Sequence, residues 1–220
     1  MPSSRPSTIP YVVSVIRQLQ PNSILDVGVG FGKWGYLFRE YTDIVQSENE
    51  PARYAKSGWK TKIEGIEGFP KYLHDGHRFI YDKIHEGNAL DILPKLDKFD
   101  VIFFGDIIEH FPLEEGKKLI RTALEHSNLC VMLTTPKFET NQGELCENPL
   151  ERHLSLWSEK EFQDVAPCRI TMADNATFVV AYAKPGAKDF KLEIRQKHVS
   201  PLRRATKAIS SPVKKFFRGK

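Results

Sequence analysis

The sequence predicts an α/β fold: a doubly wound, mostly parallel seven-stranded sheet with an antiparallel closing hairpin. Short apolar stretches alternate with stretches whose apolar residues recur at helical spacing, a pattern typical of parallel strands joined by covering helices. The last two apolar stretches follow one another across Asp174 and Asn175, which leaves no room for a helix between them. They therefore predict an antiparallel pair at the end of the sheet.

Local signals predict the individual elements. Apolar residues at helical spacing from Thr8 to Leu19, with Pro10 in the first turn, predict a first helix. Ser158 and Glu161 form a capping box that begins the last helix. The other helices are expected at residues 33–41, 70–76, 89–96 and 113–126. The strands are expected at residues 23–27, 61–67, 83–85, 99–104, 129–134, 169–172 and 177–183.

Length and composition indicate one globular domain. The 220 residues, 40% of them apolar, are enough for a single domain with its own core. Three cysteines are too few for a disulfide framework, which favours a reducing compartment. The chain has neither the apolar run of roughly 18 residues that a membrane helix needs nor a signal peptide. We therefore expect a cytoplasmic protein.

The charge is unevenly distributed. Residues 185–220 contain 11 Lys or Arg and 2 Asp or Glu, whereas residues 1–184 contain 21 and 26. We expect a mildly acidic domain over residues 1–184 and a basic C-terminal tail over residues 185–220, which excludes a uniformly basic nucleic-acid binder. Three interpretations of residues 200–220 stay open: a solvated tail, contact with an anionic membrane surface at the inner membrane face, or contact with RNA.

A glycine-rich turn, Asp26-Val-Gly28-Val-Gly30-Phe-Gly32, follows the first predicted strand and opens the next helix. Glycine lets the backbone turn tightly and approach a ligand, and the helix N-terminus favours negative charge. A dinucleotide fits one register of these glycines, and S-adenosylmethionine fits the pattern as a whole. The acidic residue before the first glycine favours S-adenosylmethionine, because a dinucleotide fold usually has an apolar residue there.

The pattern Asp-x-Gly-x-Gly-x-Gly resembles motif I of the class I S-adenosylmethionine-dependent methyltransferases, and the resemblance spans roughly residues 20–184. It implies that family's fold and S-adenosylmethionine as the methyl donor. The implied cofactor-binding residues are Asp26, Gly28, Gly30 and Gly32 in the turn, Glu67 at the ribose, Asn88 and Ala89 at the adenine, and Asp106 at the end of the fourth strand. Glu64 is the rival of Glu67, but strand alternation places Glu67 at the tip.

The run Asp106-x-x-Glu109-His110 follows the fourth strand, and His153 lies on a long loop over residues 136–156. A strand end followed by a helical turn would bring oxygen and nitrogen donors to one point, where they can hold a divalent cation. The run and His153 resemble motifs of the small-RNA 2′-O-methyltransferases and, in part, of the ubiquinone-pathway O-methyltransferases. That resemblance implies Asp106, Glu109, His110 and His153 as ligands of Mg²⁺ or Mn²⁺.

Two alternatives to a metal stay open at this point. His110 or His153 would act without metal as a general base, with Asp106 as the third catalytic residue, or the histidines would have no catalytic role. Trp157, near His153, is the best candidate among the aromatic residues for the lining of an acceptor pocket, and packing in the core is its alternative place.

The whole pattern also resembles a group of bacterial methyltransferases of cell-surface glycan clusters. The matching features include Arg39-Glu-Tyr41, Lys56-Ser-Gly-Trp59 and the run from Glu151 to Trp157. This resemblance implies a hydroxyl acceptor on a sugar, a glycan precursor or another small molecule. The alternatives are a metal-dependent RNA 2′-O-methyltransferase and a non-catalytic module that binds S-adenosylmethionine.

Overall fold

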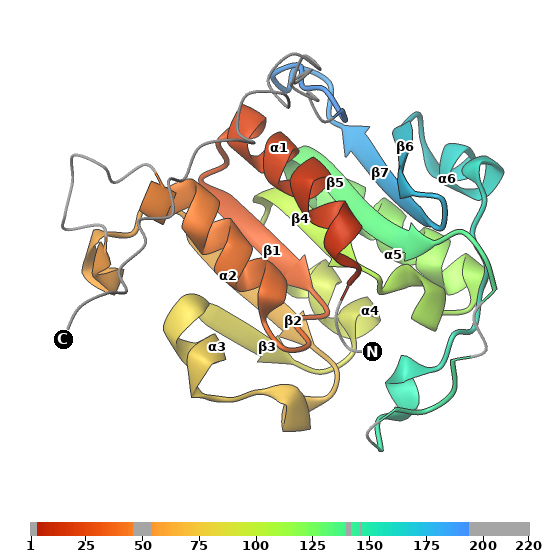
Figure 1. Ribbon diagram of the computed structural model, residues 1–220, viewed down its shortest axis with the longest axis horizontal. Coiled ribbons are helices and arrows are strands. Elements are labelled where there is room, and N and C mark those ends of the chain that lie inside the picture. Colours follow the sequence, from red (N-terminus) through yellow and green to blue (C-terminus); the bar gives the residue numbers. More distant parts are fainter. Residues whose placement is uncertain (1–3, 46–53, 140–141, 146, 194–220) are drawn as a thin grey trace, which may run out of the picture.

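Seven strands form one mixed sheet in the order β3-β2-β1-β4-β5-β7-β6 (Figure 1). The computed structural model of the protein describes residues 4–45, 54–139, 142–145 and 147–193. Four of the strand pairs are parallel, and the last two, which join β5 to β7 and β7 to β6, are antiparallel. The predicted doubly wound sheet with a closing hairpin is confirmed. The strands are β1 (Ser23–Val27), β2 (Lys62–Glu67), β3 (Lys83–Glu86), β4 (Phe99–Gly105), β5 (Ser127–Pro136), β6 (Arg169–Asp174) and β7 (Thr177–Ala183).

Helices cover both faces of the sheet, and each face has its own apolar core. Residues of α1 (Ile9–Leu19), α2 (Lys33–Arg39) and α3 (Asp75–Ile80) pack on one face. Residues of α4 (Ala89–Ile92), α5 (Leu113–His126) and α6 (Glu159–Val165) pack on the other. Because strand side chains alternate, neighbours in one strand enter different cores: Ile24 lies in the first and Leu25 in the second.

The helix expected at residues 70–76 is wrong in its position. Residues Pro70–Tyr72 form a single 3-10 turn, and α3 begins only at Asp75. The reason is a cap at His74: its Nδ1 accepts from the N–H of Gly76, and its own N–H donates to Nδ1 of His77. Histidine is not among the usual N-cap residues, so no local pattern indicated this start.

The packed part of the chain extends past residue 184, where the basic tail was expected to begin. Phe190 and Leu192 are buried in the core that contains α1, and the backbone N–H of Lys191 donates to the Gln18 side chain. The basic segment 200–220 lies outside the described residues, so membrane or RNA contact there stays a prediction. Among the described residues, no helix is both long and apolar enough to cross a bilayer.

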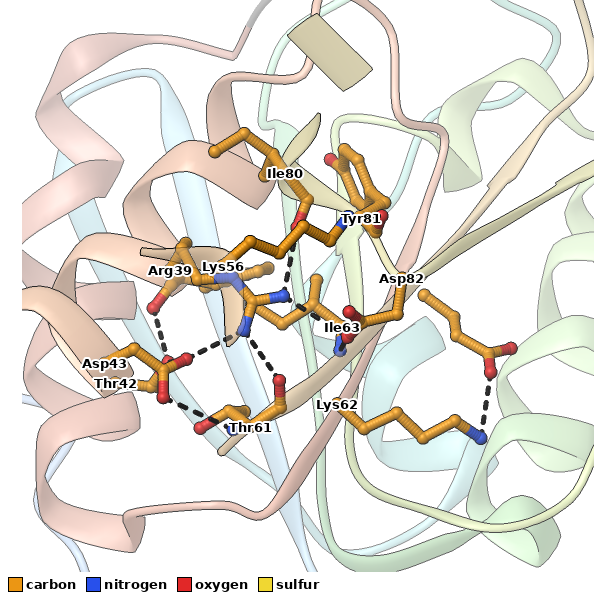
Figure 2. Close-up of polar contacts among 12 residues, drawn as sticks. Arg39, Thr42, Asp43, Lys56, Thr61, Lys62, Ile63, Ile80, Tyr81 and Asp82 are labelled. Carbon is orange, nitrogen blue, oxygen red and sulfur yellow. Dashed lines mark hydrogen bonds and ion pairs between the residues drawn. The ribbon is translucent and has the colours of Figure 1, made fainter. Parts of the chain in front are cut away.

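A buried guanidinium joins α2 to the start of β2 and the end of α3 (Figure 2). Arg39 is 1% exposed, and its two terminal nitrogens donate to the Asp43 carboxylate at 2.7 Å, to the Asp82 carboxylate at 3.2 Å and to the carbonyl oxygens of Thr61 and Ile80. The Trp59 ring lies 4.3 Å from the guanidinium carbon. The planar fork of arginine matches this set of acceptors, and lysine has no equivalent geometry.

Replacing Arg39 by methionine is expected to lower the free energy of unfolding by about 3–5 kcal/mol, because a buried carboxylate and two carbonyls lose their donor. Urea titration of the full chain measures this. Lys71→Met is the matched control, since the side chains of Lys71 and its partner Glu147 are 73% and 86% exposed, and it should change stability by less than about 1 kcal/mol. Equal stability of the two variants would contradict the role given to Arg39.

Candidate active site

The glycine turn after β1 is fixed to the end of β2 by its backbone. The N–H groups of Gly28 and Val29 both donate to the carbonyl of Ile66, at 2.8 and 3.2 Å. Gly28, Gly30 and Gly32 have φ angles of 82°, 53° and 82°, a conformation that other residues rarely adopt. At Gly28 a Cβ atom would also overlap the Ile107 side chain. The three glycines therefore occupy the positions that require glycine.

Glu67, at the end of β2, is oriented by two backbone donors. Its Oε2 accepts from Gly30 N at 2.8 Å, and its Oε1 accepts from Phe69 N at 2.7 Å. Burial raises the pKa of this carboxyl group, although both hydrogen bonds oppose the rise. Glu64 instead binds His85 at 2.7 Å and Lys62 at 2.8 Å and does not line the cavity. Glu67, and not Glu64, therefore lies at the cavity, and its contact with a ribose stays a prediction.

A residue that the sequence did not single out supports the same glycine. His77, fully buried on α3, lies 2.9 Å through Nε2 from the carbonyl oxygen of Gly30. Because Nδ1 accepts from the N–H of His74, the proton lies on Nε2, which donates to Gly30. Gly30 is therefore held from both sides, by Glu67 through its N–H and by His77 through its carbonyl.

Asp26 lies beneath the turn rather than in the cavity. It is fully buried, and its Oδ2 accepts from the Tyr81 hydroxyl at 2.5 Å; that hydroxyl in turn accepts from Gly35 N at 3.1 Å. Its Oδ1 is buried and has no hydrogen-bond partner. Burial raises the pKa of Asp26 to about 7. The geometry makes Asp26 a support for the first turn of α2, and its direct contact with a cofactor stays a prediction.

A cavity of about 310 Å³ opens above the turn at the carboxyl edge of the parallel strands. Its lining includes most of the residues predicted to bind the cofactor: Gly28, Gly30, Glu67, Asn88, Ala89 and Asp106. Asn88 also caps α4, since its Oδ1 accepts from Leu90 N at 2.9 Å. Open α/β sheets bind their ligands at this edge, so the cavity is the candidate ligand site.

Four further residues line the cavity. The sequence assigned no role to Lys33 or Ser4, whereas Tyr72 was a candidate for the pocket lining and Glu151 belonged to the run that ends at Trp157. The ammonium group of Lys33 donates to the backbone carbonyl of Ser4 from the N-terminal segment. Burial lowers the pKa of Lys33. Glu151, from the long loop, closes another side and accepts from the Tyr72 hydroxyl at 3.1 Å. These contacts join segments distant in sequence, which is why local patterns did not reveal them.

Asp106 follows β4 with φ at 56°, an uncommon value for a residue with a side chain. Its N–H donates to the carbonyl of Thr134, and its Oδ1 accepts from the Thr134 hydroxyl at 2.7 Å. The side chain therefore faces the cavity, held by the neighbouring strand. Strain of this kind tends to occur at functional sites, where the surroundings enforce it.

Three of the four predicted metal ligands come together. Donor atoms of Glu109, His110 and His153 all lie within 4.8 Å of one another, and Asp106 is not in this group. The Thr135 hydroxyl donates to Oε2 of Glu109 at 2.9 Å, whereas Oε1 is buried and has no hydrogen-bond partner. Burial raises the pKa of Glu109 well above its usual value. A buried carboxylate oxygen without a donor, next to two imidazoles, is the arrangement that a cation would complete.

Burial favours the neutral forms of the two histidines. Burial lowers the pKa of both, and for His153 the nearby His110 lowers it further. Nδ1 of His110 lies 3.1 Å from the carbonyl oxygen of Arg152, so it carries the hydrogen and Nε2 carries the lone pair. A lone pair at Nε2 can bind a metal or take a proton.

Trp157 does not line the acceptor side and takes its alternative place, in the core. It is 1% exposed, and its ring stacks on Phe162 and packs over Gly116 of α5. It anchors the end of the long loop to the second core.

Comparisons with known proteins divide between sequence and structure. Neither a search with protein-family models nor a search of curated protein sequences gives a match. Solved structures do match: DhpI in complex with SAM and HEP has a TM-score of 0.58 at 12% identity, over 81% of this chain and 86% of that chain. The chain has the class I methyltransferase fold.

Two further structures agree with this fold. The crystal structure of the N-terminal domain of EvdMO1 in the presence of SAH and D-fucose has a TM-score of 0.57 at 15% identity, over 82% of this chain and 84% of that chain. Magnesium protoporphyrin IX methyltransferase from Synechocystis, with bound SAH, has a TM-score of 0.50 at 12% identity, over 80% and 82%. At these identities the similarity is one of fold, and it confirms the fold that the motif I resemblance implied.

The Asp26→Asn variant is expected to gain stability relative to the wild type as pH rises. Folding favours protonated Asp26, because its pKa is about 7 in the folded state and 3.8 in a model compound. Wild-type stability therefore falls between about pH 4 and about pH 7 as this carboxyl group ionises, whereas asparagine does not titrate. Thermal unfolding should show the difference between the two proteins growing by about 1–4 kcal/mol between about pH 5 and about pH 8. Parallel pH curves would contradict the buried, proton-binding Asp26.

Proposed function

We propose that this protein is an S-adenosylmethionine-dependent methyltransferase that transfers a methyl group to a hydroxyl of a sugar, a glycan precursor or another small molecule. One observation carries the proposal. The cavity bounded by the glycine turn and Glu67 also contains His110, a member of the Glu109–His110–His153 group. A donor-binding cradle and a group able to activate a hydroxyl thus meet at one sheet edge. Among the structures with the same fold, DhpI was solved in complex with SAM and the EvdMO1 domain in the presence of SAH and D-fucose.

The lining residues suit each part of S-adenosylmethionine. The Glu67 carboxylate uses one lone pair of each oxygen on a backbone N–H and can still accept from ribose hydroxyls. Gly87, Asn88 and Ala89 form the side expected to face adenine. The methionine part carries an ammonium and a carboxylate group, and Asp106 and Lys33 offer one opposite charge to each.

The chain's residues fit a divalent cation at Glu109, His110 and His153. The unpartnered Oε1 of Glu109 and the lone pair on Nε2 of His110 are donors of the required kind. When bound, a cation there would lower the pKa of a coordinated hydroxyl group and fix its direction. Glu109 and His153 are held in place independently of it, because the carbonyl of Glu109 accepts from Leu154 N and Ser155 N in the segment that follows His153.

A metal-free reaction is the second candidate, and the hydrogen bond of His110 favours it. With Nδ1 fixed on the Arg152 carbonyl, Nε2 is oriented as a general base at the cavity wall. The proton of the acceptor hydroxyl would then pass to His110 as the methyl group leaves the sulfonium.

Replacing Glu67 by glutamine is expected to weaken S-adenosylhomocysteine binding at least about tenfold, because the amide NH₂ would face one of two backbone N–H donors and a hydrogen bond to the ligand would be lost. Isothermal titration calorimetry on the full chain measures this. Glu64→Gln is the matched control on the same strand and should bind like the wild type. Failure of the wild type to bind the ligand would refute the proposed function, whereas binding without turnover on any hydroxyl acceptor would favour the non-catalytic module.

Titration of Mn²⁺ into the protein saturated with S-adenosylhomocysteine is expected to show binding that Glu109→Gln and His153→Ala both weaken at least about tenfold, as loss of one ligand from a small set requires. His126→Ala is the control, since His126 bonds to Leu96 on the second core and lies outside the ligand group. Absence of binding to the wild type, together with full turnover in EDTA, would exclude the metal and leave His110 as the base.

A further inference from the structure

A second hollow, of about 610 Å³, is lined in part by Glu109 and His153, two members of the Glu109–His110–His153 group. Its described lining consists of Glu109 in the 3-10 turn after β4, Pro136 at the end of β5, and residues of the long loop: Phe138, Glu139, Gln142, Gly143, Arg152, His153, Leu154, Ser155 and Leu156. None of these residues lines the cavity above the glycine turn, which the proposed function makes the donor cavity. The hollow is therefore a separate space, and its contents are not explained by the methyl donor.

The Glu109–His110–His153 group lies between the cavity above the glycine turn and the hollow. His110 lines the donor cavity, whereas Glu109 and His153 line the hollow. The two imidazole rings have centroids 4.9 Å apart and meet edge to face. A hydroxyl group held at these three residues would face the donor on one side, and the rest of its molecule would extend into the hollow on the other.

The hollow presents large apolar side chains to solvent. Phe138, Leu154 and Leu156 are 57%, 53% and 52% exposed, and all three belong to the loop that carries His153. The loop is not loosely attached here, because Leu154 N and Ser155 N donate to the Glu109 carbonyl at 2.8 and 3.1 Å. These three apolar side chains line the hollow together with polar ones, and beside His153 they offer an apolar surface to a ligand.

The charges of the hollow argue against a phosphorylated occupant. Among the described lining residues, Arg152 is the single cation, and its guanidinium lies 3.1 Å from the Glu144 carboxylate. Glu139 adds an acidic group to the same lining. Phosphate recognition uses arginine or lysine side chains that are available to pair with it. An RNA end or a sugar phosphate would meet acidic groups here instead.

We propose that this hollow binds the non-reacting part of the methyl acceptor, and that this part is uncharged and apolar. The acceptor is then an amphiphile: a hydroxyl-bearing head at Glu109, His110 and His153, joined to an alkyl or aryl group that covers Phe138, Leu154 and Leu156. This inference rests on the proposed function, because it takes the neighbouring cavity as the donor site. It narrows the acceptor class from any small hydroxyl compound to one with an apolar substituent.

Calorimetric titration of matched glucosides into the full chain saturated with S-adenosylhomocysteine tests the inference. Hexyl β-glucoside and methyl β-glucoside offer the same hydroxyl groups and differ by five methylenes. The hexyl compound is expected to bind at least about tenfold tighter, since even partial burial of the added methylenes supplies that factor. Glucose 6-phosphate is expected to bind no tighter than methyl β-glucoside.

Variants locate the effect in the hollow. The double variant Leu154→Asn, Leu156→Asn and, separately, Phe138→Ser should each lose most of the hexyl preference, while Tyr54→Ser, at an exposed aromatic outside both spaces, should keep it. Unchanged affinity for S-adenosylhomocysteine shows that each variant is folded.

Three results would overturn the inference. The first is no hexyl preference in the wild type, and the second is a preference that survives in all variants. The third is a dimer that only the double variant dissociates, because a second copy would then cover the surface. The prior titration of S-adenosylhomocysteine separates the two proposals: donor binding without a hexyl preference removes this inference alone, whereas absent donor binding removes the proposed function.

Discussion

The shape of the cavity above the glycine turn depends on the position of the Gly30 backbone. Gly30 lies at the top of the glycine turn; its N–H donates to Glu67 from β2, and its carbonyl accepts from His77 on α3. Residues far apart in sequence thus fix the middle of a turn that has positive φ angles and lies between β1 and α2. The same carboxylate is the one proposed to bind ribose. The arrangement therefore orients Glu67 before any ligand arrives, and less order has to be imposed when one binds.

Three carboxyl groups lie buried below and beside that turn. Asp26, Glu67 and Glu109 are all buried carboxyl groups with raised pKa, yet their surroundings differ. Asp26 meets a tyrosine hydroxyl, Glu67 meets two backbone N–H groups, and Glu109 keeps one oxygen without a donor. The first arrangement supports the fold, the second suits a ligand with hydroxyl groups, and the third suits a cation. Hydrogen-bond partners, rather than residue type, distinguish the three roles.

The sequence predicted the sheet, its hairpin and most of the cavity because those features depend on local signals. Apolar runs marked the strands, and the glycine spacing marked the turn. It failed where a long-range contact decides the outcome. Trp157 was the best aromatic candidate for the acceptor pocket and is instead buried against Phe162, and the start of α3 depends on a histidine cap. Arg39 and Trp59, two features of the glycan-cluster resemblance, form a buried structural contact, so that likeness reflects packing as much as substrate.

The long loop has one further consequence, which concerns kinetics. Glu151 closes the donor cavity, and His153, two residues later, faces the second hollow. The side-chain amide of Gln142 donates to the backbone carbonyl of Glu151, and the backbone carbonyl of Gln142 accepts from His153 N. The same short segment of the loop therefore borders both the cavity and the hollow. A displacement of Glu151 on ligand binding would be transmitted to His153 through these hydrogen bonds. Donor and acceptor would then bind interdependently, so that the apparent Michaelis constant for the acceptor varies with donor concentration.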